Sequence, residues 1–466
     1  MLPSEPKIFH GRESELSDIL HLFNTGIPRI AILGAGGMGK TSLAQVLLHH
    51  PDIIARYAQN RFFVACSSAM TTLELVNLIG AHLGLKPSKD LTQAVLQHFS
   101  SNPPSLLILD ELETLWEPAN SRGDIEELLS LLTIPPTDSS QITMRGAERP
   151  AKALWTRPFL RTLQPLDQQA ARLTFVDIAD SGHSQEEVDK ILSLTDNMPL
   201  AISLLAHLAD TEGCSNVLSG WETKRTSLIS EGFDKRSNLD LSISLSLSSP
   251  RVQLLPHSQE LLSLLSMLPD GLADSDLIQS KIPFDNILKC KAALKSTALA
   301  YSDEHKRLKV LMPIREYLQQ HRPPGDHLVQ KVFKYFEEML KFYREYSGTQ
   351  SNSKTVAQIK SHFTNIQNVL QWGLKQKQPI LSKSIYCICH LNHFSLASMH
   401  PLTLLIGQTQ DILSQLHDHQ LKAYFMIELL NRLGSYPNSD LEALSFQALE
   451  HLKHFDDPDL KCALSV

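Results

Sequence analysis

The stretch Arg29-Ile-Ala-Ile-Leu-Gly-Ala-Gly-Gly-Met-Gly-Lys-Thr-Ser-Leu43 decides the fold of this chain. It starts as an apolar strand at 30–33, continues as a glycine-rich turn and ends where an apolar helical pattern begins. Residues 34–41 match the phosphate-binding pattern G-x-x-x-x-G-K-[ST]. Glycines let the backbone wrap its N–H groups around a phosphate, and the following helix points the positive end of its dipole at the anion. The stretch therefore predicts a phosphate-binding loop in which Lys40 reaches the outer phosphates and the Thr41 hydroxyl binds Mg²⁺.

Length and composition set the outer limits. The chain has 466 residues, which at about 150 residues per domain suggests three or so domains, and its hydrophobic content of 42% suits a globular protein. The net charge of -7 gives no reason to expect non-specific nucleic-acid binding. The apolar run at 199–209 is too short to cross a bilayer, and the first residues carry no apolar signal segment. We therefore expect a cytoplasmic protein with no membrane partner.

The six cysteines are scattered, which favours a reducing compartment over a disulfide framework. Cys387-Ile-Cys389-His390, followed by His393, is the one cluster that resembles a metal site. If this segment is helical, the two cysteines point to different faces and cannot share a tetrahedral ion. We therefore expect these side chains to pack in a core.

A second strand is predicted at 61–66, helices at 72–83 and 91–99, and a third strand at 105–109 that ends in Asp110 and Glu111. A carboxylate at the end of a buried parallel strand lies where a Mg²⁺ ligand belongs beside a phosphate-binding loop. Asp110 is therefore expected to hold the water shell of the magnesium ion. Glu111 is expected to orient or deprotonate an attacking water.

A helix is predicted at 125–132 and another strand at 141–145, which ends in Arg145. Parallel strands present their carboxyl ends on one side of a sheet, so Arg145 is expected to face the same crevice and to sense the outermost phosphate. The alternative is a plain surface arginine. The alternation of strands and helices predicts a doubly wound α/β domain with a parallel sheet.

Two further motifs flank this region. Gly11-Arg12-Glu13 precedes the loop, and Asn197-Met-Pro199-Leu200 opens an apolar helix after helices predicted at 168–179 and 184–194. Taken singly they are an ordinary helix cap and a proline in a first helical turn. Their order along the chain carries more information than either motif alone.

The ordered set of motifs from Gly11 to Leu200 resembles the nucleotide-binding domain of the STAND class of P-loop NTPases. It is most similar to the NB-ARC family of plant resistance proteins, apoptotic scaffold ATPases and fungal NLR-like proteins. The amino-acid sequence of residues 143–158 resembles that of fungal members that carry tetratricopeptide-type (TPR) repeats. The resemblance covers roughly residues 8–320.

The resemblance implies ATP and ADP as ligands with Mg²⁺, and it implies roles for single residues. The magnesium would be held by Thr41 and Asp110, and the catalytic set would be Lys40, Asp110, Glu111 and Arg145, with Arg145 sensing the γ-phosphate. The nucleotide-binding set would be Phe9, Arg12, Gly34, Gly36, Gly37, Met38, Gly39, Lys40, Thr41, Ser42 and Pro199. Within it, the segment around Phe9 and Arg12 would clasp the base and sugar, and Pro199 would pack near the adenine. In such proteins ADP locks the domains closed, and exchange for ATP opens them for assembly.

The same resemblance suggests four domains. They are an NB-ARC P-loop domain at 1–205, a helical ARC subdomain at 206–255, a winged-helix domain at 256–323 and degenerate TPR-like helices at 324–466. Alternation of Leu and Ser at 241–249 looks like a strand, but the family places a helix there, and we expect a helix.

The winged-helix region departs from the family pattern. Family members often carry a Met-His-Asp motif whose histidine touches the β-phosphate of ADP, and Val310, Leu311 and Met312 stand at those positions. Neither Leu311 nor Met312 can donate a hydrogen bond from its side chain. The lock is therefore expected to be weaker, or to depend on another donor such as Arg315.

Helical periodicity dominates the rest of the chain. Helices are predicted at 328–346, 356–374, 381–394, 402–416, 421–433 and 441–452, which suits an α-solenoid, although no clean repeat period is visible. The pattern runs on to Val466, so we expect the chain to be cut short, and no effector domain is expected before the P-loop domain.

Two functions of different classes follow. The favoured one is an NLR-like switch in innate immunity or self/non-self recognition, with slow ATP hydrolysis, self-association through the nucleotide-binding domain and an unknown ligand at the C-terminal helices. The alternative is an AAA+-like ATPase that remodels a partner by repeated hydrolysis, with an arginine supplied across subunits, for which Arg149 and Arg157 are candidates. A DNA-binding regulator is disfavoured by the acidic balance and the absence of a basic recognition helix at 256–320.

Overall fold

A computed structural model describes residues 2–86, 88, 90–101, 103–132, 139–180, 182–224, 239–346, 353–398, 405–414, 416–433 and 441–454. The expectations for 225–238 and for the end of the chain at 455–466 lie outside these residues. The chain forms two compact units. Unit 1 consists of Met1–Ser266, Asn286–Ser302 and Val310–Pro323, and unit 2 of Met267–Asp285, Asp303–Lys309 and Pro324–Val466.

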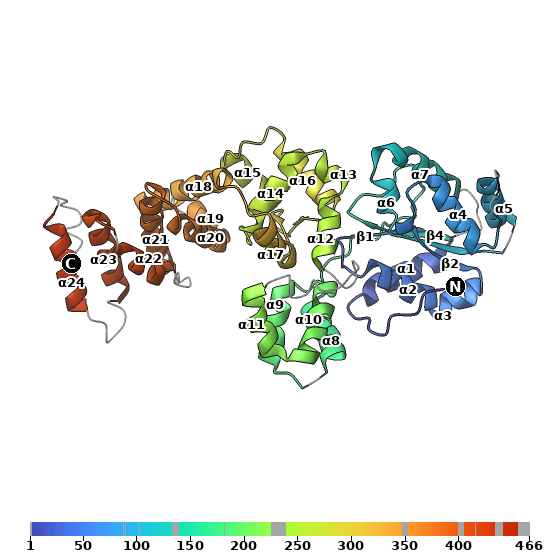
Figure 1. Ribbon diagram of the computed structural model, residues 1–466, viewed down its shortest axis with the longest axis horizontal. Coiled ribbons are helices and arrows are strands. Elements are labelled where there is room, and N and C mark those ends of the chain that lie inside the picture. Colours follow the sequence, from blue (N-terminus) through green and yellow to red (C-terminus); the bar gives the residue numbers. More distant parts are fainter. Residues whose placement is uncertain are drawn as a thin grey trace. The chain divides into compact units, whose positions relative to one another are not determined.

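Unit 1 contains a four-stranded parallel sheet (Figure 1). Its strands are β1 Arg29–Gly34, β2 Arg61–Ala65, β3 Leu106–Asp110 and β4 Ser139–Arg145, in the order β1-β4-β3-β2. In register, Gly34 lies beside Arg145, and Ala65 lies beside Asp110. The carboxyl ends of the strands therefore meet at one edge, as the sequence predicted. The strand that carries Arg145 lies between the strand of the phosphate-binding loop and the strand of Asp110.

Helices pack on this sheet because its strands are apolar on both faces. They are α1 Glu13–Thr25, α2 Lys40–His49, α3 Pro51–Tyr57, α4 Thr72–His82, α5 Leu91–Ser101, α6 Glu113–Trp116 and α7 Ala119–Leu132, with a short 3₁₀ turn at Cys66–Ser68. Val64, Leu107 and Leu109 lie in one buried cluster with apolar side chains of α4, α5 and α7. This core fixes the strand ends from which the site residues project.

The remainder of unit 1 is mainly helical. It contains α8 Gln168–Ala179, α9 Gln185–Thr195, α10 Pro199–Glu212, α11 Cys214–Lys224, α12 Leu239–Leu247, α13 Pro250–Gln253, α14 Pro256–Ser266, α16 Ile287–Ser296 and α17 Met312–His321, with the two-residue strand β5 Tyr301–Ser302. The expected helix at 241–249 is present as α12. Leu239, Ile243 and Leu247 are buried at a spacing of four residues, which is the spacing of a helical face and not of a strand.

Unit 2 is also mainly helical. It contains α15 Asp274–Gln279, β6 Leu308–Lys309, α18 Asp326–Glu345, α19 Ser353–Ser361, α20 Phe363–Leu374, α21 Ile380–Ala397, α22 Leu405–Ser414, α23 His419–Leu433 and α24 Leu441–Leu452. Cys387 and Cys389 are buried within α21, and the described residues contain no group of three or more potential ligands that could hold a metal ion. No helix in the described ranges is long and apolar enough to span a membrane.

The single helix predicted at 356–374 is wrong, because α19 ends and α20 begins on either side of His362. The His362 ring is buried. Its Nε2 lies 3.3 Å from Asp276 Oδ2, and its Nδ1 lies 2.8 Å from Arg307 Nη2. These long-range contacts fix the residue with φ −114° and ψ 16°, outside the helical range. A tertiary contact has overridden a continuous apolar period. The TPR assignment and the four-domain division remain predictions.

Candidate nucleotide-binding site

The predicted phosphate-binding loop connects β1 to α2. Gly37 and Gly39 have φ values of +78° and +83°, a region that residues with a Cβ rarely adopt. The Leu200 N–H, in the first turn of α10, donates to Gly37 O at 3.1 Å. A Cβ on Gly37 would lie 2.6 Å from Met198 Cε and 2.8 Å from Leu200 Cβ. The loop is therefore shaped for phosphate and is also packed directly against α10.

Lys40 begins α2 and folds back over the loop. Its Nζ donates to Gly34 O at 3.1 Å and to Ala35 O at 2.8 Å. Burial lowers the pKa of Lys40 to about 8, and Glu113 is the carboxylate that opposes this shift most strongly. The ammonium group is thus held at the place where the outer phosphates of a bound nucleotide would lie.

Asp110 is fully buried at the end of β3. The Thr41 hydroxyl donates to its two carboxylate oxygens at 3.0 and 3.1 Å, and the Thr143 hydroxyl donates to Oδ1. Burial raises the pKa of Asp110, and the bonds from Thr143 and Thr41 act against this. A hydroxyl beside a carboxylate, next to a phosphate-binding loop, is a hard-oxygen donor set that fits Mg²⁺. The predicted pair Thr41 and Asp110 is brought together.

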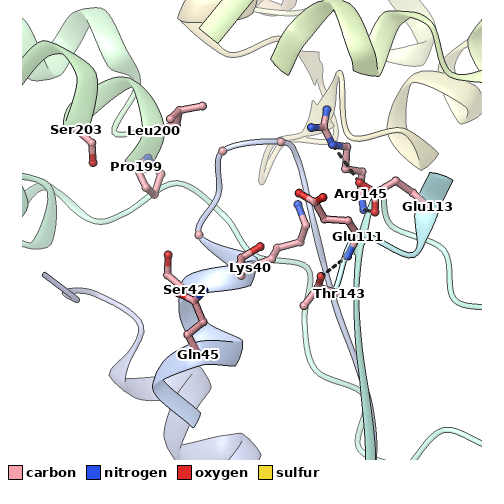
Figure 2. A pocket seen from close by; sticks show the side chains of 14 residues that line it. Lys40, Ser42, Gln45, Glu111, Glu113, Thr143, Arg145, Pro199, Leu200 and Ser203 are labelled. Carbon is pink, nitrogen blue, oxygen red and sulfur yellow. Dashed lines mark hydrogen bonds and ion pairs between the residues drawn. The ribbon is translucent and has the colours of Figure 1, made fainter. Parts of the chain in front are cut away.

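Glu111 follows Asp110 with a φ of +63°, an unusual backbone conformation for a residue with a side chain. Its N–H donates to the Thr143 hydroxyl at 3.0 Å. Figure 2 shows the carboxylate of Glu111 and the ammonium of Lys40 pointing into the same pocket. Such outliers persist where the surrounding structure over-determines them, which is common at functional sites.

Arg145 lies at the end of β4, as predicted, but it is not a plain surface arginine. Its Nε pairs with Glu113 Oε1 at 3.2 Å, and its Nη1 donates to Ser246 Oγ at 2.8 Å. Figure 2 shows this residue and Glu113 at the rim of the pocket, across from Pro199. The cation therefore lies at this pocket, with contacts to α6 and α12.

The pocket between the phosphate-binding loop and α10, which we call the phosphate cavity, has a volume of about 290 Å³. One wall is formed by the loop and the start of α2, and the opposite wall by Pro199, Leu200 and Ser203 of α10. Figure 2 shows these three residues across the opening from Lys40. A ligand in the cavity would contact both the P-loop region and the helical region of unit 1.

A second cavity of about 300 Å³ adjoins the first and shares Gly39, Ser42, Pro199 and Ser203 with it. The rest of its lining comes from the N-terminal segment 6–10, which includes Phe9, and from Arg12, Met38, Leu166, Thr174, Ile178 and His207. A mixture of apolar walls and polar groups is typical of a site for a small molecule.

Arg12 is buried below the second cavity. Its Nη2 donates to Met38 O at 3.2 Å and to Gln164 O at 2.5 Å, and its Nη1 pairs with Glu15 at 3.2 Å. Burial lowers the pKa of Arg12, and Glu15 is the strongest opposing charge. The contacts show that Arg12 fixes the phosphate-binding loop from outside, in addition to lining the cavity.

Most predicted site residues line one of the two cavities, and two do not. Asp110 is hydrogen-bonded to Thr41, which lines the phosphate cavity. Gly34 is at the end of β1 and lies against Leu163. Leu311 lines a third cavity of about 210 Å³ beside Ala35 and Met38, and the Met312 N–H donates to Asp196 at 2.5 Å.

Sequence reasoning missed Glu113, Thr143, Ser203 and His207. Ser203 and His207 follow Pro199 at steps of four residues, so helical spacing would have placed them on the same face of α10. No helical spacing of that kind marks Glu113. It begins the short helix α6, three residues after Asp110 at the end of β3.

Residues 28–154 match the family model described as an AAA domain. A search of curated proteins found no match. Among solved structures, a Walker-type ATPase of Pyrococcus abyssi is 13% identical, with 69% of this chain and 98% of that chain covered and a TM-score of 0.45. A STAND protein with a tetratricopeptide repeat sensor from Pyrococcus horikoshii is 15% identical, with 99% and 73% covered and a TM-score of 0.33. Cdc6p from Pyrobaculum aerophilum is 14% identical, with 72% and 96% covered and a TM-score of 0.38.

At TM-scores below 0.5 these likenesses carry no information on function. The family match covers the sheet, the phosphate-binding loop, Asp110 and Arg145, which are the parts that form the phosphate cavity. The match and the parallel sheet agree with each other. The described part of residues 28–154 therefore has the P-loop NTPase fold, and its sequence is similar to the AAA domain family.

Proposed function

We propose that this chain is a STAND-type switch that binds ADP in a closed state and ATP in an open, self-associating state. The proposal extends beyond the P-loop NTPase domain to the helical parts that follow it. In this proposal hydrolysis is slow, because the switch acts through the relative populations of its two states and not through the amount of product formed. Self-association uses the nucleotide-binding domain, and a ligand or protein partner acts at the C-terminal helices.

One observation carries the proposal, which is the position of α10. The Leu200 N–H donates to Gly37 O at 3.1 Å, and Pro199 and Ser203 line the phosphate cavity and the adjoining cavity. A nucleotide would therefore contact α10 and the P-loop at once. A ligand shifts an equilibrium only through its different affinity for the two states, and a site with two walls from different regions provides such a difference.

Within the site, we propose roles that the contacts support. The N–H groups of the loop and Lys40 bind the phosphates, and Phe9 and Pro199 enclose the base. Thr41 and Asp110 would hold Mg²⁺, which when bound supplies positive charge for the phosphate oxygens. In this proposal Glu111 orients a water at the outer phosphate, and Arg145 senses whether that phosphate is present.

The test begins with the nucleotide that the purified chain carries. After denaturation, chromatography and mass spectrometry identify it, with Lys40→Ala as the matched control. Light scattering then compares the mass of the chain in ADP and in a non-hydrolysable ATP analogue. Near-stoichiometric ADP that is absent from the variant, and a larger mass only with the analogue, are expected for a switch.

A second function, remodelling of a partner by repeated hydrolysis, is favoured by the AAA family match alone. It predicts an empty site after purification and rapid multiple turnover of added ATP. That combination would replace the switch by the remodelling ATPase. Arg149, whose guanidinium lies over the Phe159 ring and donates to Leu160 O, would then be tested as the arginine supplied across subunits.

A further inference from the structure

The Glu113 carboxylate is bound to Arg145 at two points. Its Oε1 lies 3.2 Å from Arg145 Nε, and its Oε2 accepts from the Arg145 main-chain N–H at 3.2 Å. One carboxylate thus fixes both the backbone and the side chain of the same arginine. The side-chain direction of Arg145 is therefore set by Glu113 rather than by the strand alone.

The other end of the guanidinium reaches α12. Arg145 Nη1 donates to Ser246 Oγ at 2.8 Å, and the Ser246 residue is only 8% exposed. Ser246 belongs to the helix whose apolar face is formed by Leu239, Ile243 and Leu247. A residue of the phosphate cavity is thereby hydrogen-bonded to a helix more than ninety positions later in the chain.

The pair also forms a partition between two cavities. Arg145 and Glu113 line the phosphate cavity, and both also line a neighbouring cavity of about 240 Å³ that reaches Ser246. The two side chains of the pair are 13% and 11% exposed. Charges with so little water around them interact more strongly than surface charges do. A change in the partner of Arg145 therefore alters the lining of both cavities.

Glu113 also lines the same cavity as Lys40, the second cation of the site, and it is the carboxylate that opposes the lowering of the Lys40 pKa most strongly. A third phosphate would approach the same two cations, Lys40 and Arg145. It would compete with Glu113 for both, because each cation has limited donors and the two anions repel each other.

We propose that Glu113 takes the place of the third phosphate: with a diphosphate bound it positions Arg145 on Ser246, and a triphosphate draws Arg145 away and releases α12. This deepens the proposed nucleotide switch and rests on it. Glu113 and Ser246 act through Arg145 and are positioning residues. Their effect is on the preference between di- and triphosphate, not on binding as such.

The experiment measures the dissociation constants of ADP and a non-hydrolysable ATP analogue for the full chain by calorimetry. Glu113→Gln keeps the shape and removes the competing charge, and Ser246→Ala removes the acceptor on α12. Both variants are expected to shift the ADP-to-ATP preference toward the triphosphate on the order of tenfold, the effect of one hydrogen bond to a charged group.

Ser248→Ala is the matched control, because Ser248 is exposed just after α12 and its hydroxyl donates to Ser244 O at 2.9 Å. It should leave the preference unchanged. Hydrogen exchange of the amides of α12 is the second readout. In the wild type they should exchange faster with the ATP analogue than with ADP, and this difference should vanish in Ser246→Ala and return in Ser246→Thr.

The outcomes separate the two proposals. A wild-type chain that binds neither nucleotide contradicts the proposed function. A wild-type chain that binds both, with variants that weaken both to the same extent or leave the preference unchanged, shows Glu113 and Ser246 to be structural residues and overturns only this inference. Should Glu113→Gln fail to fold, Ser246→Ala decides by itself, because it removes only one hydroxyl.

Discussion

Lys40 holds a positive charge where protein atoms have replaced most of its water, and burial lowers its pKa to about 8. A phosphate ligand needs the charged form, so its affinity should be constant below about pH 7 and should fall as the pH rises through 8. At pH 9 about a tenth of the free protein has a charged Lys40, which predicts an ADP dissociation constant about tenfold higher than at pH 7. Calorimetry at the two values measures this directly.

Lys40→Arg is the control, since an arginine keeps its charge throughout this range. Its ADP affinity, whatever its level at pH 7, should not fall between pH 7 and 9. An equal fall in both proteins would place the titrating group elsewhere. The same shift affects stability without ligand. The unfolded chain binds the proton more tightly, so burial of the charged lysine costs stability below pH 8, and this cost disappears as the pH rises toward 10.5.

Gly37 and Gly39 provide a matched pair at the same scale. Both have positive φ, so an alanine is strained at either position, but only a Cβ on Gly37 meets neighbouring atoms, at Met198 and Leu200. Gly37→Ala should therefore lower the free energy of unfolding by about 1–3 kcal/mol more than Gly39→Ala, the usual cost of overpacking. Chemical denaturation without nucleotide measures the difference. Equal losses would show that the contact with α10 is not tight.

At the scale of secondary-structure elements, the junction of α19 and α20 depends on buried polar contacts. Asp276 accepts from Tyr335 OH at 3.0 Å as well as contacting His362. Burial alone would raise the pKa of Asp276, and these contacts hold it below its usual value. His362→Ala leaves a buried carboxylate with one partner fewer and should cost about 2–4 kcal/mol.

Hydrogen exchange at the amides of α20 should be faster in that variant by the corresponding factor. His417→Ala, at an exposed position before α23, is the control and should change nothing. If His362→Ala exchanges at the wild-type rate, the break between the two helices has another cause than the histidine.

The sequence predicted those elements whose pattern is local. The four strands and α8 follow from apolar runs and helical spacing, and Thr41 with Asp110 follows from a motif whose partners meet wherever parallel strands end together. The break at His362 could not be predicted, because its partners Asp276 and Arg307 are distant in sequence. Glu113 was missed for the same reason: its partner Arg145 comes from another strand, and no local pattern marks a carboxylate for such a pairing.

At the scale of the whole molecule, all residues that line the nucleotide site belong to unit 1. Ligand binding stabilises what it binds by mass action, so ADP at a hundredfold excess over its dissociation constant should stabilise unit 1 by about 2.7 kcal/mol. The slowest amides of β1, β3 and β4 should then exchange about a hundredfold more slowly. Hydrogen exchange with and without ADP tests this, and unchanged rates in the sheet would contradict a nucleotide site there.

The central place of β4 has a consequence for how such a protein can report its ligand. Ile142 is paired with Leu109 on one side, and Arg145 lies beside Gly34 on the other. The main chain from Ser140 to Ile142 is thus bonded along both edges and cannot shift without breaking two ladders. A ligand at the end of this strand is therefore reported more easily by the side-chain torsion angles of Arg145 than by a shift of the strand. A change in side-chain torsion angles is local and fast, and it needs no distortion of the sheet that holds the ligand.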